Sequence, residues 1–491
     1  MDSPPRSNSV RTLFWVAALF ILIAAGARFI HLEADFPVQL TKSGAPLSDE
    51  GWHSNAAARY WLFGYWYLPG DVNRVIMQPT FQVLQWFSFG ALGVSLTSAR
   101  LTAVLLFLGL VALMASTIRT ETGPTGALIA GALLSTDFHL FAYSRIALID
   151  LPMLFFVIAS LCLLVTQGSK RPLFGGLMAG FVFSLALLTK PSALFAAPIL
   201  LLTALLGSEG WRNKWKQSLA FLAGTILLTG SHHLIAGWLF RSDQPAHWKL
   251  ISSKIQFEGM GLWERTWSGI TIMASRDVLL CLAMLISIAV VAQHWRKKGF
   301  ASQRVTIFFM LGTAGSFAVI ASSHYQPVRY FTPLIALSIG AVSLATAIAL
   351  SNHWRTVSAL LLSLVALHIG VGTFRIVDYL AYPKWSYRDF CKELRSDLEE
   401  SDRLLLMGDM APQVSLATGI EAISGLVGSQ PAVLRFQEYR PTHLITRSPF
   451  TDRLTAAVGS RAELELVKTY DVMENYYEGP VYLHAVTQAV D

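Results

Sequence analysis

Long apolar stretches separated by short polar connections run from residue 12 to residue 373. A helix needs about 20 mostly apolar residues to cross the hydrocarbon core of a bilayer. On this criterion the pattern predicts a polytopic α-helical membrane protein with about eleven membrane-spanning helices. We place them at residues 12–30, 100–118, 123–143, 148–166, 173–189, 191–207, 218–239, 277–294, 304–322, 329–350 and 355–373.

The first apolar segment has two interpretations. It follows Arg6 and Arg11, and Ala25-Gly26-Ala27 resembles the cleavage site of a signal peptide. The apolar run is longer than the apolar core of most signal peptides, so we favour a retained helix. The rest of the topology is the same in either case.

The first loop, residues 31–98, is rich in tryptophan and tyrosine instead of carrying a second span. Such side chains favour the interface between membrane and water. We therefore predict two amphipathic helices along the bilayer surface, one at Ser54–Tyr67 and one starting at Pro79 and reaching Phe89.

The basic residues of the connections fix a predicted orientation, because cytoplasmic loops carry an excess of Lys and Arg. A cytoplasmic N-terminus places every main basic group inside, namely Lys170 and Arg171, then Arg212, Lys214 and Lys216, then Arg296, Lys297, Lys298 and Arg304, and finally Arg355. We thus expect a multi-pass protein of the cytoplasmic membrane with residues 31–98 on the extracytoplasmic side.

The composition changes after residue 373, where charges become frequent. Residues 388–400 have the pattern of an amphipathic helix, and short apolar runs follow at residues 403–407, 443–445 and 481–483. This alternation predicts a small α/β domain in residues 374–491, after a transmembrane domain in residues 1–373. An odd number of spans places that domain outside the cell.

The overall composition agrees with a membrane protein and excludes several classes. The 491 residues are 53% hydrophobic and 14% charged, against about 25% charged in soluble domains. The net charge of +7 does not call for nucleic acid as a partner. The three cysteines lie far apart, and no nucleotide-binding glycine motif is present, so a disulfide framework, a zinc finger and ATP or NAD chemistry are not indicated.

Asp49 and Glu50 are adjacent acids in the first outside loop, just before a predicted helix near Gly51. Acids favour helix N-termini, so one interpretation is that they cap this helix. The other is that an acidic pair held at the membrane surface acts on a lipid-borne substrate. Position alone does not separate the two interpretations.

Four more polar residues fall at outside ends of predicted spans. Arg145 and Asp150 share one turn, Lys190 lies between two spans, and Arg329, followed by Tyr330, opens a late span. Arginine suits the forked recognition of a phosphate, and lysine meets it as a point charge. Interfacial anchoring of the cations and helix capping by Asp150 are the structural alternatives.

Together these residues resemble the GT-C membrane glycosyltransferases, in particular the dolichyl-phosphate-mannose protein mannosyltransferases and the bacterial aminoarabinose transferase of lipid A. The resemblance spans roughly residues 10–350 and rests on Asp49-Glu50 and on Arg145 with Asp150, which match an R-x-x-x-x-D pattern. It implies transfer of a sugar from a polyprenyl-phosphate donor to a lipid, glycan or protein acceptor at the outer face of the membrane. It requires no cofactor, although a divalent metal remains open because three outside carboxylates could converge.

Within this resemblance we expect Asp49 to act as the general base, with Glu50 and Asp150 orienting the acceptor or the cations. Arg145, Lys190 and Arg329 with Tyr330 would bind the donor phosphate, and inversion at the anomeric carbon would follow. Relatives often carry a lysine where this chain has Gln78, and Arg74 is the candidate to replace it.

Two other classes compete with this interpretation. A transporter or flippase usually shows internal repeats and broken helices at mid-membrane, and neither pattern is visible in the sequence. A membrane sensor would use the C-terminal domain to bind a ligand and would leave Asp49 and Glu50 unexplained.

Overall fold

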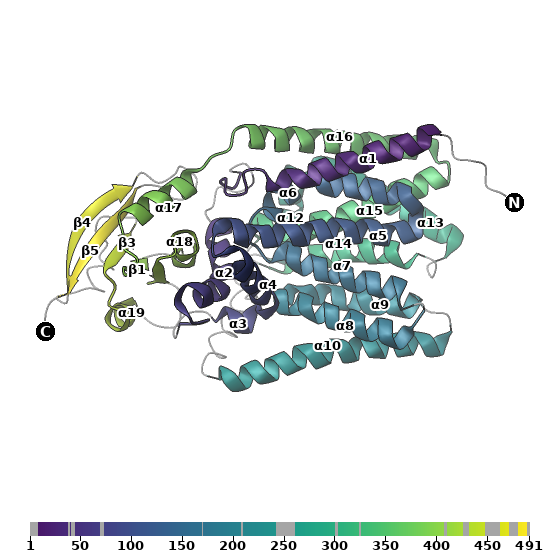
Figure 1. Cartoon of the computed structure of the whole chain (residues 1–491). Helices are drawn as coiled ribbons and strands as arrows, with labels where there is room; N and C mark the ends of the chain where they lie inside the picture. The colour runs from purple at the N-terminus through teal and green to yellow at the C-terminus, as the bar shows by residue number, and fades with distance from the viewer. Residues whose placement is uncertain are drawn as a thin grey trace.

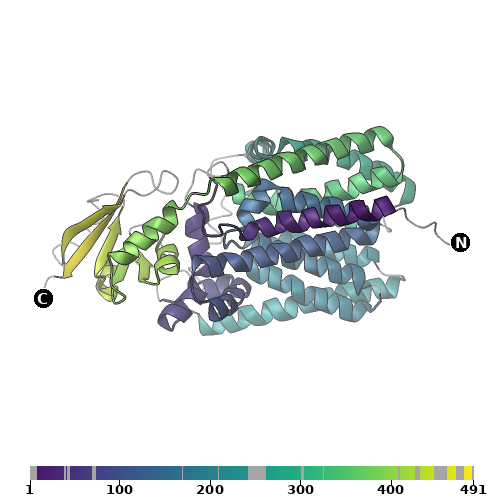
Figure 2. The ribbon, with the colours of Figure 1, turned by 45° about the horizontal axis from the view of Figure 1, so that its top comes forward.

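The computed structural model describes residues 8–37, 40, 45–68, 73–168, 170–207, 210–241, 261–299, 303–323, 326–406, 410–425, 432–446, 462–470 and 480–488. Its main body is a bundle of long helices whose axes are roughly aligned. A small sheet domain lies beyond one end of the bundle (Figures 1 and 2). The N-terminal helix begins at the opposite end. The membrane orientation predicted from the loops stays a prediction, as does the domain boundary near residue 374.

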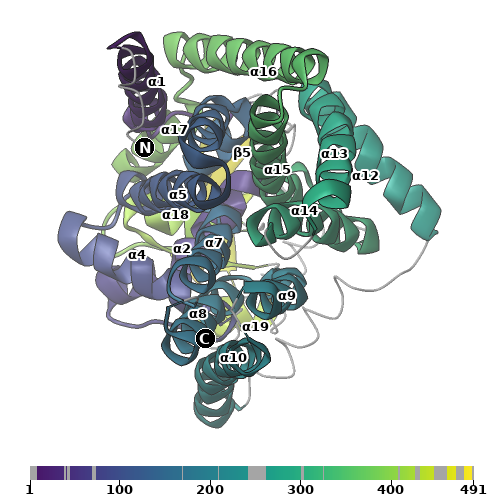
Figure 3. The same cartoon turned by 90° about the vertical axis from the view of Figure 1, so that its right-hand side faces the viewer.

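The bundle confirms the helical membrane architecture that the apolar pattern predicted. Its long helices are α1 (Asn8–Gly26), α5 (Leu96–Thr136), α7 (Asp150–Thr166), α8 (Pro172–Thr189), α9 (Ala197–Gly207), α10 (Trp211–Leu239), α13 (Val278–Lys298), α14 (Arg304–Ser322), α15 (Phe331–Ser351) and α16 (Arg355–Ala381). Seven of the described helices are long and apolar enough to cross a membrane, and three shorter apolar helices accompany them. Seen end-on, α8, α9 and α10 lie on one side of α7, and α13 to α16 lie on the other (Figure 3).

Helix α5 contains two of the predicted spans, because the chain reverses inside it. Gly123 has φ +70° and ψ −163°, which is not helical, and Pro124 follows. Arg100 near the start of α5 donates to the carbonyls of Leu32 and Ala34, at 2.8 and 3.0 Å. The carbonyl of Ser135 near its end accepts from Arg28 at 3.0 Å. A straight helix of 41 residues would separate these ends by about 60 Å. The chain therefore reverses at Gly123, the first residue of the second of the two spans predicted at residues 100–118 and 123–143.

The first loop forms α2 (Ala45–Phe63), α3 (Arg74–Met77) and α4 (Pro79–Leu92) at the end of the bundle that faces the sheet domain (Figure 1). The predicted start at Pro79 is confirmed, and Gly93 at φ +79° ends that helix. Helix α2 starts earlier than the sequence suggested and is mostly buried along Glu50–Arg59. It is a packed helix between the bundle and the C-terminal domain, not one lying freely on a bilayer surface.

An amphipathic helix that was not predicted lies before α13. α12 (Leu262–Arg276) is amphipathic and precedes α13, and it exposes Trp263 and Trp267. It has 15 residues and a charged face, so the criterion of a long apolar run does not detect it.

The C-terminal residues form the predicted α/β domain. Its elements are α17 (Ser386–Ser396), β1 (Arg403–Leu406), α18 (Ala411–Thr418), β2 (Glu421–Ser424), α19 (Ala432–Tyr439), β3 (His443–Thr446), β4 (Ala462–Tyr470) and β5 (Val481–Gln488). The strand order is β2-β1-β3-β5-β4, with β1 parallel to β2 and β3, and β5 antiparallel to β3 and β4. The apolar runs at 403–406, 443–445 and 481–483 are strands, and residue 407 lies outside the described residues.

Candidate active site

Asp49 and Glu50 lie within α2, at its fifth and sixth residues, so neither caps the start of that helix. Consecutive helical residues point about 100° apart, and the two acids have different surroundings. The Glu50 side chain has no exposed surface, whereas that of Asp49 is 22% exposed.

Glu50 is bound on both of its oxygens by donors from three other segments. Arg100 donates from Nε to Oε1 at 2.8 Å and from Nη2 to Oε2 at 3.0 Å. The backbone N–H of Ala147 reaches Oε1 at 3.0 Å, and Gln413 Nε2 of the C-terminal domain reaches Oε2 at 3.1 Å. These four bonds occupy the carboxylate and join α2 to α5, to the turn before α7 and to α18. The geometry favours a structural role for Glu50, in place of the predicted role in orienting the acceptor.

Asp49 faces the bundle and forms an ion pair with Arg329. Arg329 belongs to η3 (Val328–Tyr330), a single turn that leads into α15, and its side chain is 12% exposed. The sequence placed these two residues on the same side of the membrane, and the structure brings them into contact.

Asp150 and Lys190 form a second ion pair, with Nζ 2.5 Å from Oδ1. Asp150 is the first residue of α7, and Lys190 lies between α8 and the turn η2 (Pro191–Ala196). Burial lowers the pKa of Lys190, but the charges of Asp150 and Tyr330 raise it by more, so the net pKa lies above its usual 10.5. The lysine is therefore a cation at neutral pH.

The ring of Tyr330 connects the two ion pairs. The Lys190 ammonium lies 4.4 Å from the ring centroid, and the Arg329 guanidinium carbon lies 5.4 Å from it. We call these five residues, Asp49, Asp150, Lys190, Arg329 and Tyr330, the Tyr330 cluster. Its two carboxylates balance two cations, so an incoming anionic group can replace a carboxylate as partner of either cation.

Arg145 lies apart from the Tyr330 cluster within the described part of the chain. Its Nη2 donates to the carbonyl of His31 at 2.5 Å, and its guanidinium carbon lies 5.0 and 5.2 Å from the ring centroids of Phe141 and Tyr379. Burial lowers its pKa to about 10, with a further lowering from Arg100 and a partial rise from Tyr379. It remains charged at neutral pH, and the structure gives it no contact with Asp49 or Lys190.

Arg74 begins α3, and its guanidinium carbon lies 5.5 Å from the ring centroid of Trp52 on α2. The neighbouring Gln78 is 4% exposed, and its Oε1 lies 2.7 Å from Nδ1 of His53. Gln78 thus holds α2 against the start of α4, where the resemblance implied a lysine.

Sequence reasoning missed Arg100 and Gln413. A charged residue at the outer end of a predicted span was a usable signal for Arg100, since buried charges need partners. Gln413 carries no such signal, because its contact with Glu50 depends on how the C-terminal domain packs against α2.

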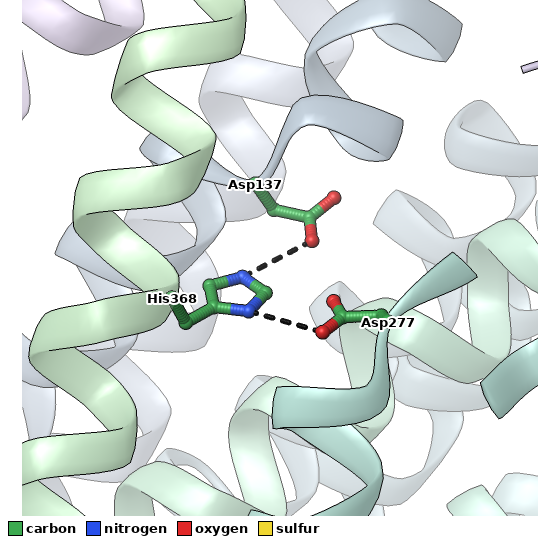
Figure 4. A group of neighbouring side chains, drawn as sticks. All are labelled: Asp137, Asp277 and His368. Atoms are coloured by element: carbon green, nitrogen blue, oxygen red, sulfur yellow. Dashed lines mark ion pairs between the residues drawn. The ribbon is translucent and has the colours of Figure 1, made fainter. Parts of the chain in front are cut away.

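The outside carboxylates Asp49, Glu50 and Asp150 are paired with Arg329, Arg100 and Lys190, respectively. Among the described residues, the group whose ligand atoms lie close enough to share a metal is a different one, formed by Asp137, Asp277 and His368 (Figure 4). This group of three residues shares no residue with the Tyr330 cluster.

Comparison with known proteins gives a match to a family model over part of the chain, and a fold. Residues 78–235 match the family model described as dolichyl-phosphate-mannose-protein mannosyltransferase. A search of curated proteins finds no match. Among solved structures, the chain is similar to ArnT from Cupriavidus metallidurans bound to undecaprenyl phosphate, with a TM-score of 0.66 and 12% sequence identity, over 96% of this chain and 98% of that one. It is also similar to the oligosaccharyltransferase of Archaeoglobus fulgidus in complex with Zn and sulfate, with a TM-score of 0.58 and 11% identity, over 87% of this chain and 68% of that one.

Both solved structures are membrane glycosyltransferases of the GT-C fold. The helical bundle, the loop helices at one end and the sheet domain beyond them all fall within the aligned region. The chain therefore has the GT-C fold of the membrane glycosyltransferases, and its residues 78–235 match the model of the dolichyl-phosphate-mannose-protein mannosyltransferases.

Proposed function

We propose that this protein transfers a sugar from a polyprenyl-phosphate-sugar donor to a lipid, glycan or protein acceptor of the cell envelope, at the outer face of the membrane. The observation that carries the proposal is the Tyr330 cluster, in which Asp49, Arg329, Lys190 and Asp150 meet around one aromatic ring. The cluster lies at the end of the bundle where α2 packs, next to the C-terminal domain. The similarity to a structure with bound undecaprenyl phosphate supports the choice of donor class.

The two cations suit the donor phosphate. When the bond to the sugar breaks, the departing polyprenyl phosphate gains a second negative charge. Lys190 and Arg329 are charged at neutral pH and are held in place by contacts with Tyr330. Fixed cations in a partly buried site stabilise such a developing charge without having to reorganise.

Asp49 is the proposed general base, because it is a partly exposed carboxylate next to a phosphate-binding cation. While it pairs with Arg329, its negative charge is stabilised and it accepts a proton poorly. A donor phosphate that takes Arg329 as its partner weakens that pair and makes Asp49 a stronger base. Donor binding would thus prepare the carboxylate to remove the proton from the acceptor hydroxyl or amine.

The acceptor attacks the anomeric carbon as the phosphate leaves from the opposite face, so we expect inversion. No enzyme nucleophile is needed, since the proton goes to Asp49 and the electron pair of the broken bond goes to the phosphate oxygen. Asp150 keeps Lys190 oriented through the 2.5 Å contact, and Glu50 keeps α2 in position. The chemistry requires no cofactor.

A matched pair of substitutions tests the proposal. Asp49→Asn keeps the size of the side chain but removes the base, so transfer should fall by at least ~10²-fold while donor affinity does not fall, since the phosphate no longer competes with Asp49 for Arg329. The control is Asp389→Asn, because the side chain of Asp389 is 61% exposed in the C-terminal domain. Single-turnover transfer of radiolabelled sugar from a polyprenyl-phosphate donor, in vesicles, gives the rate.

Transfer at the parental rate by Asp49→Asn would show that Asp49 is not the general base and would contradict the proposal. Movement of the labelled lipid across the vesicle membrane with no transfer of its sugar would instead support the transporter or flippase class.

A further inference from the structure

Three side chains that the proposed reaction does not use meet between helices that are far apart in sequence. Asp137 precedes α6 (Phe138–Ser144), Asp277 precedes α13, and His368 lies in the middle of α16. Figure 4 shows the imidazole between the two carboxylates. Its Nε2 lies 3.2 Å from Oδ2 of Asp137, and its Nδ1 lies 3.3 Å from Oδ1 of Asp277.

Each carboxylate also caps a helix, which fixes its position. Oδ1 of Asp137 accepts from the backbone N–H of Leu140 at 2.7 Å, and Oδ1 of Asp277 accepts from that of Leu280 at 2.9 Å. Capping explains why an Asp stands at each site. It does not explain why both caps converge on a buried histidine.

Helix α16 is held against this point by a close backbone approach. Gly372 lies one turn after His368, and a Cβ atom at Gly372 would come within 2.1 Å of the carbonyl oxygen of Thr136. Any larger residue would push α16 away from Asp137. The glycine therefore sets the distance at which the histidine meets the carboxylates.

A cavity adjoins the three side chains. It has a volume of about 120 Å³, and His139, Arg276 and Arg375 line it together with Asp137, Asp277 and His368. The side chain of His139 is 6% exposed, and its Nε2 lies 3.1 Å from Thr332 Oγ1. Its Nδ1 is buried and has no hydrogen-bond partner in the part of the chain that the structure describes. A buried ring nitrogen without a partner is costly unless something occupies the space beside it.

We propose that Asp137, Asp277 and His368 bind a divalent metal ion of the zinc class. Imidazole nitrogens with carboxylate oxygens are a common ligand set for zinc. One ligand atom of each residue lies within 4.8 Å of the other two, so a rotation of the imidazole would bring one of its nitrogens and both carboxylates around a single ion. The metal replaces the proton that the imidazole shares with the carboxylates, and that proton is released.

The metal would have a structural role. It would join the end of α5, the start of α13 and the middle of α16, whereas no residue of the Tyr330 cluster takes part. This site is therefore independent of the proposed glycosyl transfer and is tested without measuring activity.

The experiment is a zinc titration of the purified full chain in detergent, after chelator treatment and desalting. Mass spectrometry counts the retained Zn²⁺, and the unfolding temperature is recorded with and without Zn²⁺. We expect one retained ion per chain and a higher unfolding temperature with zinc, because binding only to the folded state stabilises it.

Asp277→Asn and His368→Asn should each weaken zinc binding by at least ~10-fold, since even outer partners of metal ligands cost 10–100-fold. Asn caps helices about as well as Asp, so Asp277→Asn isolates the loss of the anionic ligand. The matched control is His353→Asn, because His353 is exposed and its φ of +55° suits asparagine. Asp49→Asn should retain zinc, which locates the ion away from the Tyr330 cluster.

Zinc retention itself distinguishes the metal site from a simple ion triad, because a protonated His368 paired with two carboxylates binds no metal. Absence of retained zinc in the parent chain, or equal retention by all of the variants, would overturn the proposal. Loss of zinc in Asp49→Asn alone would do the same, by placing the ion at the candidate active site.

Discussion

The two adjacent acids of α2 should lose very different amounts of folding stability when their charge is removed. Glu50→Gln replaces a carboxylate whose side chain is fully buried and leaves the Arg100 guanidinium, 2% exposed, without a counter-ion. Removing one partner of a buried ion pair costs about 3–5 kcal/mol, because the remaining charge stays buried. We expect a loss of that size in the free energy of unfolding.

The contacts of Glu50 set this magnitude. In the Glu50→Gln variant the side-chain carbonyl would still accept the N–H of Ala147, so that bond does not add to the cost. The new NH2 group, in the place of Oε2, can accept no hydrogen bond, so the donations from Arg100 Nη2 and from Gln413 Nε2 are both lost. By comparison, the pair between Asp49 and Arg329 is partly exposed, and losing it should cost no more than about 1 kcal/mol.

Thermal unfolding of the purified protein in detergent, followed by tryptophan fluorescence, measures the difference. The control is Glu400→Gln, because the side chain of Glu400 is 88% exposed. A second variant, Glu50→Gln with Arg100→Met, should recover part of the loss by removing the unpaired charge. If Glu50→Gln unfolds at the same temperature as the control, the carboxylate does not hold these four segments together and the reasoning fails.

Three further predictions concern the candidate site. Arg329→Ala should lower the affinity for the lipid phosphate more than Arg145→Ala, since Arg329 belongs to the Tyr330 cluster and Arg145 does not. Equal losses of affinity in a binding titration would place both arginines at the donor. Gly51→Ala should cost about 1–3 kcal/mol in unfolding experiments, because the new Cβ would lie 2.3 Å from the backbone nitrogen of Gln413; an unchanged unfolding temperature would contradict this packing. The pKa of Lys190 is raised above 10.5. Its ion pair with Asp150 therefore contributes fully to stability below that pH and is lost only as the pH rises through the raised pKa. A fall in donor affinity attributable to Lys190 between about pH 7 and 9 would contradict this prediction.

The membrane helices were predictable from the sequence because a bilayer leaves few alternatives. Backbone groups in lipid must be paired within the segment, so each long apolar run becomes a helix. The apolar pattern also separated residues 100–118 from residues 123–143 as two spans, and the chain reverses at the start of the second. Helix α12 was not predicted because its apolar and polar residues alternate with a helical period and form no continuous apolar run.

The candidate site was predictable only to the level of which residues share a side of the membrane. Asp49, Asp150, Lys190 and Arg329 were expected on one side, and the structure brings them together. Which acid pairs with which cation depends on how helices are rotated about their axes, and packing sets that rotation. The contrast between Glu50 and its neighbour arises in this way, because α2 begins at Ala45 and meets α18 of a domain more than 350 residues away.

The bond between Gln413 and Glu50 limits how this protein can be recombined with its relatives. A chimera that exchanges the C-terminal domain at the connection near residue 385 would pair the native α2 with a foreign α18. The close approach at Gly51 would then meet a new backbone, and the buried carboxylate would lose one of its donors. Exchanges that carry α2 and α18 together keep this contact intact, so both helices must come from the same parent protein although they lie far apart in the sequence.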